Sequence, residues 1–163
     1  MVNMKEKRRS GCPIAFGLDI FGDRWSLLVL RDMIFEGKSR FADFLGSDER
    51  ISTNILAARR EQLACAGMIE KVADPDDGRR FAYAPTSKGL DLIPLLLEFV
   101  RWSGKHDAHT EAPPEFVQLL ERDRDGVIAM VRGRFTRPGM VPPPLFQRPA
   151  KPVPKPRRRK TLR

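Results

Sequence analysis

Apolar side chains recur every three to four residues over much of the chain, a spacing that places them on one face of an α-helix. The pattern predicts helices over residues 12–21 and 25–36, and a short helix that begins at a Ser39 cap. A fourth helix is predicted over residues 52–66, where Gly67 ends it. The second helix is apolar on most of its faces, so we expect it to be buried on most sides.

Two short stretches with strand character follow the fourth helix, at Ile69–Ala73 and at residues 80–84. A polar turn separates them, and Gly78 in this turn can adopt a positive φ. Two helices around a tight turn, followed by a β-hairpin, make a winged helix-turn-helix, whose helix fits a DNA major groove and whose basic ribbon fits a minor groove. The predicted fold is therefore mainly α with a small β-hairpin: a winged helix-turn-helix with flanking dimerisation helices.

A fifth helix, predicted over residues 87–106, has more apolar surface on one face than a small domain needs for its own core. The side chains on this face are Leu92, Leu95, Leu96, Phe99 and Trp102. Burial in a homodimer interface is the simplest way to remove these side chains from water. A sixth helical segment, over residues 115–135, is expected as one helix or as two pieces, because Gly126 and neighbouring charged residues interrupt it.

Charge is distributed unevenly along the chain. The 163 residues include 30 lysines and arginines and 21 acids, and residues 137–163 hold nine of the cations, eight prolines and no acid. Residues 1–136 therefore carry 21 charges of each sign. We predict a flexible basic N-terminus (1–11), a winged helix-turn-helix domain (12–106), a C-terminal helical extension (107–136) and a disordered, proline-rich basic tail (137–163).

The fourth helix has an inner and an outer face on a helical wheel. Leu56, Arg60 and Leu63 share the inner face. The outer face carries Asn54, Ala57, Ala58 and Glu61. Thr53, Asn54 and Ala57 lie in the first turns, from which asparagine can pair with adenine and an alanine methyl can contact a thymine methyl. The alternative for Asn54 is that it only satisfies backbone groups near the helix cap.

Arginines around this helix are predicted to contact the DNA backbone, and of the two hairpin arginines one is predicted to enter or straddle the minor groove and the other to meet the backbone. The complete set of predicted DNA-contacting residues is Ser39, Arg40, Arg50, Ser52, Thr53, Asn54, Ala57, Arg59, Arg79 and Arg80. Isolated surface arginines would not indicate DNA binding. Arg79 and Arg80 indicate it because they lie at a hairpin tip that follows a helix-turn-helix.

The sequence resembles the HxlR-type family of bacterial winged-helix regulators, which is similar to the MarR group. The resemblance covers residues 12–102 and is carried by Cys12-Pro13, Gly22-Asp23-Arg24-Trp25, Leu30-Arg31-Asp32, Ile51-Ser52-Thr53-Asn54, Asp76-Asp77-Gly78-Arg79-Arg80, Thr86 and Lys88-Gly89. It implies a homodimer, paired through its terminal helices, that binds a pseudo-palindromic operator in double-stranded DNA as a repressor or an activator.

Two features depart from the family pattern. Arg60 stands where the family usually has leucine, on the inner face of the fourth helix, so we expect it to extend outward to solvent or to pair with an acid. The basic tail has no counterpart in the family, and it could either add DNA affinity without sequence preference or have no role.

Cys12 is the candidate sensor residue. It precedes the first predicted helix and follows a basic run, and a helix N-terminus and nearby cations both stabilise a thiolate. Some HxlR-type regulators use the matching cysteine to sense oxidants or electrophiles, so the resemblance implies control by an oxidant or an electrophile here. The alternative is that Cys12 packs as a small apolar residue in a dimer interface. A small-molecule effector also stays open, and Cys65 is expected in the core.

No catalytic or metal-binding constellation accompanies these features, so the predicted protein is not an enzyme and needs no cofactor. Its two histidines, His106 and His109, match no metal or triad pattern, and its cysteines do not suit a disulfide framework. Without a long apolar segment, it is expected to be a cytoplasmic, nucleoid-associated protein with no membrane partner. The competing hypothesis is a winged-helix protein-interaction module whose basic tail binds nucleic acid nonspecifically.

Overall fold

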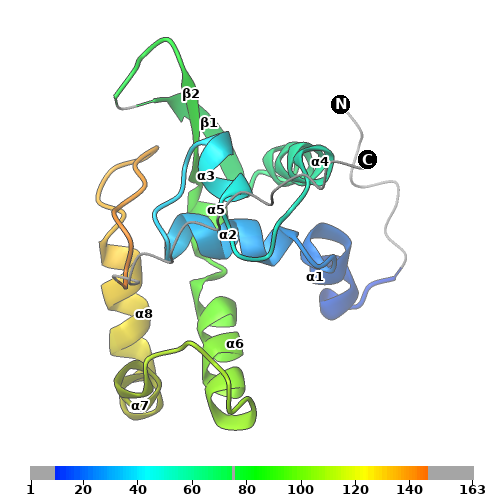
Figure 1. The fold of residues 1–163 in the computed structure, drawn as a ribbon. Helices are drawn as coiled ribbons and strands as arrows, with labels where there is room; N and C mark the ends of the chain where they lie inside the picture. The colour runs from blue at the N-terminus through cyan, green and yellow to red at the C-terminus, as the bar shows by residue number, and fades with distance from the viewer. Residues whose placement is uncertain (1–9, 75, 147–163) are drawn as a thin grey trace, which may run out of the picture.

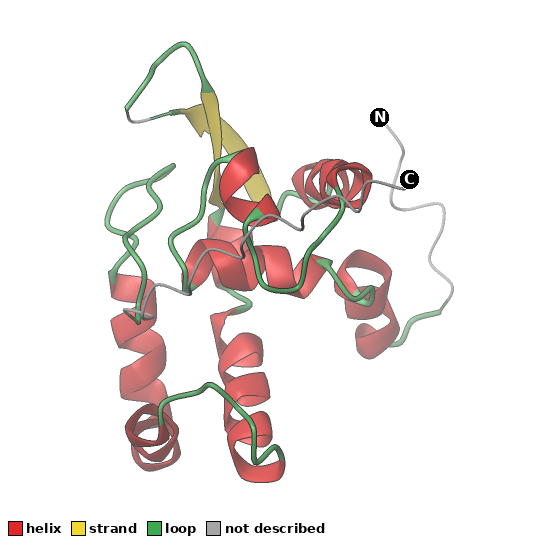
Figure 2. Cartoon of the chain, viewed as in Figure 1, coloured by secondary structure: helices red, strands yellow, loops and turns green. Residues whose placement is uncertain are grey.

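The computed structural model describes residues 10–74 and 76–146. Within these ranges lie α1 (Pro13–Phe21), α2 (Ser26–Ile34), α3 (Phe41–Leu45), α4 (Thr53–Cys65), β1 (Ile69–Ala73), β2 (Phe81–Pro85), α5 (Ser87–Leu90), α6 (Ile93–His106), α7 (Pro114–Arg122) and α8 (Arg124–Gly133). Helices dominate, and the two strands form one hairpin (Figure 2). The predicted fold class, mainly α with a winged helix-turn-helix, is confirmed.

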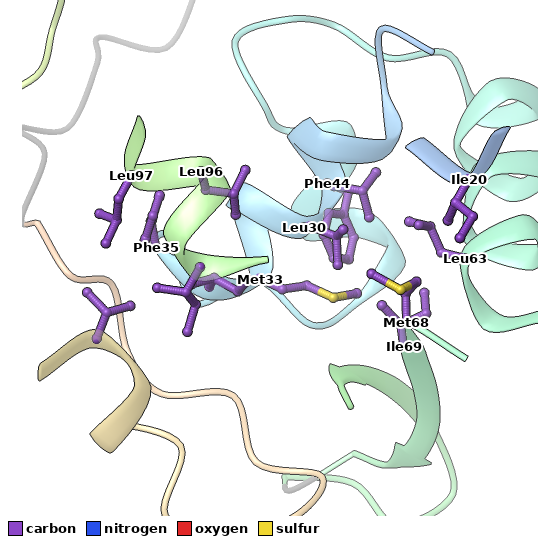
Figure 3. Packing of buried hydrophobic residues seen from close by; sticks show 14 of the residues in the cluster. Ile20, Leu30, Met33, Phe35, Phe44, Leu63, Met68, Ile69, Leu96 and Leu97 are labelled. Carbon is purple, nitrogen blue, oxygen red and sulfur yellow. The ribbon is translucent and has the colours of Figure 1, made fainter. Parts of the chain in front are cut away.

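The helix α2 occupies the centre of the molecule (Figure 1) and packs against α1, α4, β2 and α6. Leu30, Met33 and Ile34 of this helix are fully buried. The core extends along α2, from Phe35 and α6 at one end to Ile69 and α4 at the other (Figure 3). One continuous core therefore joins the helix-turn-helix to the C-terminal helices.

The strands pair antiparallel, with Ile69 opposite Pro85 and Ala73 opposite Phe81. The second strand begins one residue later than predicted. Gly78 does not adopt the positive φ open to it, since the glycines with positive φ in the described chain are Gly37, Gly67 and Gly139. Carboxylates shape this turn instead: the Asp74 side chain accepts the Asp76 backbone N–H at 2.9 Å.

One predicted helix start moved by one residue, one predicted helix is divided, and the sixth segment forms the two pieces that were one of its expected forms. Arg40, and not Ser39, is the N-cap of α3, because the Asp43 carboxylate accepts the Arg40 backbone N–H at 2.9 Å. The predicted helix over residues 87–106 is two helices, since Pro94 in the first turn of α6 has no N–H to continue the turn before it. The sixth segment is also two helices, and the break lies at Asp123, which caps α8 through the Gly126 N–H.

The first ten residues of the predicted tail, 137–146, are packed against the domain, which corrects their assignment as disordered. The Leu145 N–H donates to the Phe35 carbonyl at 2.6 Å, and the Phe146 ring meets Phe116 edge to face, with centroids 4.8 Å apart. Pro142 is buried. The remaining predicted tail and most of the predicted flexible N-terminus lie outside the described residues.

No helix in the described ranges combines the length and the apolar character that crossing a bilayer requires.

The base of the hairpin is fixed to the end of α4 by residues 86–89. The Thr86 hydroxyl donates to the Gly67 carbonyl at 2.6 Å, and the Lys88 ammonium donates to the Ala66 carbonyl at 2.6 Å. Gly89 lies against the same backbone, where an added Cβ would sit 2.1 Å from the Met68 carbonyl oxygen. This close approach excludes any larger residue without a backbone shift.

Gly89→Ala is therefore expected to lower the free energy of unfolding by about 1–3 kcal/mol or more, because the new methyl group meets backbone atoms. Gly78→Ala is the control: an added Cβ at Gly78 has no atom within 4 Å, so its effect should stay within about 0.5 kcal/mol. Urea denaturation of both variants measures the difference, and equal stabilities would contradict the close packing at Gly89.

Candidate nucleic-acid interface

The helix α4 separates into a buried and an exposed face, as the helical wheel predicts. Leu56 and Leu63 are fully buried. The outer residues Thr53, Asn54, Ala57, Ala58 and Glu61 are all exposed. Ser52 is the N-cap and has extended backbone angles, so the chain enters the helix with its first turn open to solvent. The exposed face is confirmed, and its contact with DNA stays a prediction.

The hairpin tip carries the two predicted wing arginines, both exposed. Arg80 pairs with Asp77 in the same turn, with Nε and Oδ2 3.1 Å apart. The Arg79 guanidinium has no hydrogen-bond or ion-pair partner in the described part of the chain. The tip therefore presents at least one arginine whose donors are available to a ligand.

An exposed aromatic side chain beside the wing arginines escaped prediction from the sequence. Phe81 is 61% exposed, and the Lys71 ammonium lies 3.5 Å from its ring centroid. Ala82 and Ala84, which alternate with Phe81 and Tyr83, are buried, as is Pro85 at the end of the strand. The alternation of small and aromatic residues was the available signal, but it does not say which set faces the core.

Two of the predicted phosphate-contacting arginines form ion pairs within the protein. Arg40 binds Asp74 with both arms, Nε to Oδ2 at 2.5 Å and Nη2 to Oδ1 at 2.8 Å, and it also contacts Asp76. These hydrogen bonds hold the pKa of the Asp74 carboxyl well below its usual range. Arg59 lies 3.2 Å from Asp23. Arg40 thus ties the start of α3 to the base of the hairpin, whatever it contributes to DNA.

The turn between α3 and α4 is held by charged groups of α2. The Asp32 carboxylate is buried and accepts from the Ser47 hydroxyl at 2.5 Å and from the Lys38 ammonium at 3.1 Å. Arg31 binds the Glu49 carboxylate with two nitrogens, at 2.6 and 3.1 Å. Its hydrogen bonds lower the pKa of Glu49 from 4.5 to about 2.

Arg50, next in this turn, has a φ of 55°, in the left-handed region, and its side chain is exposed. A non-glycine residue in this region is uncommon and needs support from its surroundings. The Arg50 backbone N–H donates to the Ser47 carbonyl at 3.0 Å, which holds the residue in the turn. The predicted site residues Arg50, Ser52, Thr53, Asn54 and Ala57 are thus brought together on one exposed surface, from the turn to the first turns of α4.

The family model described as HxlR-like helix-turn-helix matches residues 20–111, which include this turn, α4 and the hairpin. The chain belongs to the HxlR-like helix-turn-helix family. An uncharacterised HTH-type transcriptional regulator, sll1512 of Synechocystis, is 34% identical over 86 residues, which are 53% of this chain and 63% of the relative. The match thus spans less than two thirds of that relative's length.

Two solved structures share the arrangement. PA1607, a proposed transcription factor, is 36% identical and superimposes with a TM-score of 0.57 over 64% of this chain and 72% of its own. The redox regulator HypR in its oxidised form is 26% identical, with a TM-score of 0.52 over 58% of this chain and 97% of its own. The names of these relatives describe sll1512 as a transcriptional regulator, PA1607 as a proposed transcription factor and HypR as a redox regulator.

Arg60, the residue that departs from the HxlR family pattern, is half-buried and pairs with no acid in the described part of the chain, so the expected ion pair is wrong. Its guanidinium lies between two aromatic rings, 4.5 Å from the centroid of Phe41 and 4.3 Å from that of Tyr83. The Nε atom is buried without a hydrogen-bond partner, and burial lowers the pKa of the group. The arginine stem and the stacked rings fill the space that a leucine would occupy.

Both cysteines of this HxlR-like chain are exposed. The expectation that Cys65 belongs to the core is therefore wrong. Cys65 lies on the outer side of α4, at the end of the helix, where it is exposed to solvent. Cys12 is the N-cap of α1, and its backbone N–H donates to the Ser10 hydroxyl at 3.2 Å. Its thiol is accessible within the single chain.

Glu49→Gln is expected to lower the free energy of unfolding near neutral pH, because it removes the charged acceptor of Arg31. The folded pKa of about 2 lies below the ordinary 4.5, so this stabilisation is complete above pH 4.5 and is lost as the pH falls toward about 2. The gap between wild type and variant should close over that window in urea denaturation.

Glu61→Gln, the same change at an exposed position on α4, is the matched control and should leave the pH profile unchanged. A gap between wild type and Glu49→Gln that stayed constant down to pH 2 would contradict a stabilising charge pair at the turn.

Proposed function

We propose that the protein is a DNA-binding transcription regulator that acts as a homodimer on a pseudo-palindromic operator, with α4 in the major groove and the hairpin in the adjacent minor groove. The observation that carries this is the open outer face of α4 beside an open, arginine-tipped hairpin. The hairpin projects away from α6, α7 and α8 (Figure 1), and α4 packs against β1 at its base. Both elements are therefore free to approach one duplex.

Sequence reading is assigned to the first turns of α4. Asn54 offers both a donor and an acceptor to an adenine edge, while Thr53 and the Ala57 methyl group can contact neighbouring bases. Glu61, on the same face, would repel phosphates, so close contact is confined to the N-terminal half of the helix. Ser39, Ser52 and Arg50 border this zone and are assigned to the DNA backbone.

Arg40 and Arg59 are assigned a weaker part in DNA binding, because acids of the protein already occupy them. The Arg40 side chain is still 40% exposed and could reach a phosphate with its remaining donors. The wing arginines, above all Arg79, have no such competition from a buried acid. We therefore assign the minor-groove contact to Arg79 and Arg80, and treat Phe81 as a neighbour that limits how the tip can tilt.

Dimerisation is supported by large apolar side chains left exposed on the first and sixth helices. Ile14 and Leu18 of α1 are 72% and 59% exposed, and Phe99 and Trp102 of α6 are 54% and 62% exposed. Exposed apolar clusters of this kind are typical of protein interfaces. A two-fold dimer would also place two α4 helices on successive turns of one face of the DNA, as a pseudo-palindrome requires.

Cys12 is the proposed sensor of the oxidant effector. Its exposure next to the apolar residues of α1 would let an oxidised or alkylated thiol alter the same dimer contacts. The likeness to HypR, a redox regulator, is compatible with this role. The part of the predicted tail that follows Phe146 is proposed as an accessory that adds DNA affinity without sequence preference.

Arg79→Ala in the full chain is expected to weaken binding to DNA from the gene's own upstream region and to lower the slope of log affinity against log salt by about 1. Asn54→Ala should instead reduce the preference over scrambled DNA, by about 1–3 kcal/mol at one base pair. A fluorescence anisotropy titration over a salt series measures both.

Arg101→Ala is the matched control, because Arg101 is an exposed arginine on α6, away from α4 and the hairpin. It should leave both quantities unchanged. Unchanged binding in all three variants would reject this docking, and an absent preference in the wild type would favour the interaction-module hypothesis.

Leu18→Glu and Trp102→Glu are each expected to turn the dimer into a monomer of about one chain mass, 18.6 kDa. The reason is that a carboxylate loses its hydration when the apolar interface closes over it. Met130→Glu, at a 42% exposed apolar position on α8, is the matched control and should remain dimeric. Light scattering after size exclusion gives the mass, and a wild-type monomer at all concentrations would overturn the dimer.

A further inference from the structure

A cavity of about 610 Å³ lies between α2, α6 and the start of α7. We call it the α2–α6 cavity. Its wall includes Leu27, Leu28, Phe35, Leu96, Phe99, Val100, Ala112, Pro113, Phe116 and Phe146. Its volume falls in the range of pockets that hold small organic ligands. The last four of these residues follow position 111, the end of the family match, so this chain's own C-terminal extension forms part of the site.

The wall favours a neutral, largely aromatic ligand. Four phenylalanine rings contribute to it, and rings pack well on rings. Its charged members are three acids, Asp23, Glu36 and Glu111, and two bases, Arg24 and Arg31. Arg31 is already bound by Asp32 and Glu49, so the wall offers no uncommitted cluster of cations for an anion.

Two hydroxyl groups supply polar contacts among these rings. Ser103 and Thr110 both line the cavity. The Thr110 oxygen accepts the Ala112 N–H at 3.3 Å, which leaves its own O–H free to donate. A ligand carbonyl or hydroxyl could accept from these groups while its ring lies against the phenylalanines.

We propose that the α2–α6 cavity binds a neutral aromatic small molecule bearing a hydroxyl or carbonyl group, and that its binding alters the affinity for DNA. The second part rests on the proposed function. Arg31 lines the cavity, and its guanidinium holds Glu49 in the turn before α4. A ligand that displaces Arg31 would therefore release Glu49 and loosen the turn that leads into α4.

The test uses the full chain and N-phenyl-1-naphthylamine, a neutral aromatic probe whose fluorescence rises in apolar surroundings. Wild type should bind it saturably, with one site per chain. Ala112→Trp should weaken binding at least about tenfold, because the indole fills the cavity. Ala108→Trp, an exposed alanine in the same segment that does not line the cavity, is the matched control and should bind as wild type does.

Ser103→Phe fills the cavity from α6 and carries the test if Ala112→Trp fails to fold. No saturable binding to wild type, or equal binding to the filled and control variants, would overturn the site. Tighter binding of the anionic analogue, anilinonaphthalene sulfonate, to the same site would overturn the neutral-ligand assignment.

The regulatory part is tested by DNA affinity with and without saturating probe. We expect a shift of at least about threefold in wild type and in Ala108→Trp, and none in Ala112→Trp. A probe that binds without any shift would overturn the coupling to DNA. Operator preference that persists in a protein with no probe binding would reject the cavity proposal alone and leave the proposed function standing.

Discussion

The rest of the structure depends on the need to bury α2 on every side. Leu30, Met33 and Ile34 leave it almost no face for solvent, so one helix needs partners in several directions. The DNA-reading elements cover one end, and α6 with residues 137–146 covers the other (Figure 1). The reading module and the C-terminal helices are therefore parts of one core, and a change at one end of α2 is felt at the other.

Local patterns predicted most of this architecture, because helical spacing and turn residues act over a few positions. The strand at Ile69–Ala73 and the two faces of α4 followed from such patterns. The failures were of another kind. The composition of residues 137–146 indicates that they cannot form a core of their own. It does not indicate whether single side chains such as Leu145 and Phe146 can pack onto a core that other elements form, which is what the structure shows.

The properties of the candidate site likewise divide into those that local sequence predicts and those that depend on distant residues. Exposure of Asn54 and Ala57 could be predicted, since it depends only on the helical wheel. The partners of the arginines could not, because Arg40 meets Asp74 and Arg31 meets Glu49 across 34 and 18 positions of sequence. Arg60 shows the limit most clearly: the choice between solvent, an acid and two aromatic rings depends on what the neighbouring elements place there.

These pairings change how the charge of the domain should be understood. Residues 1–136 carry equal numbers of acids and bases, so no overall field draws the reading face to DNA. Acids such as Asp74 and Glu49 instead fix arginines that shape the hairpin base and the turn. The affinity that this domain supplies must then depend on how well a few open groups, Asn54 and Arg79 among them, match the grooves. Because that match depends on geometry, a shift of Arg31 of a few tenths of an ångström could change binding without altering any DNA-contacting residue.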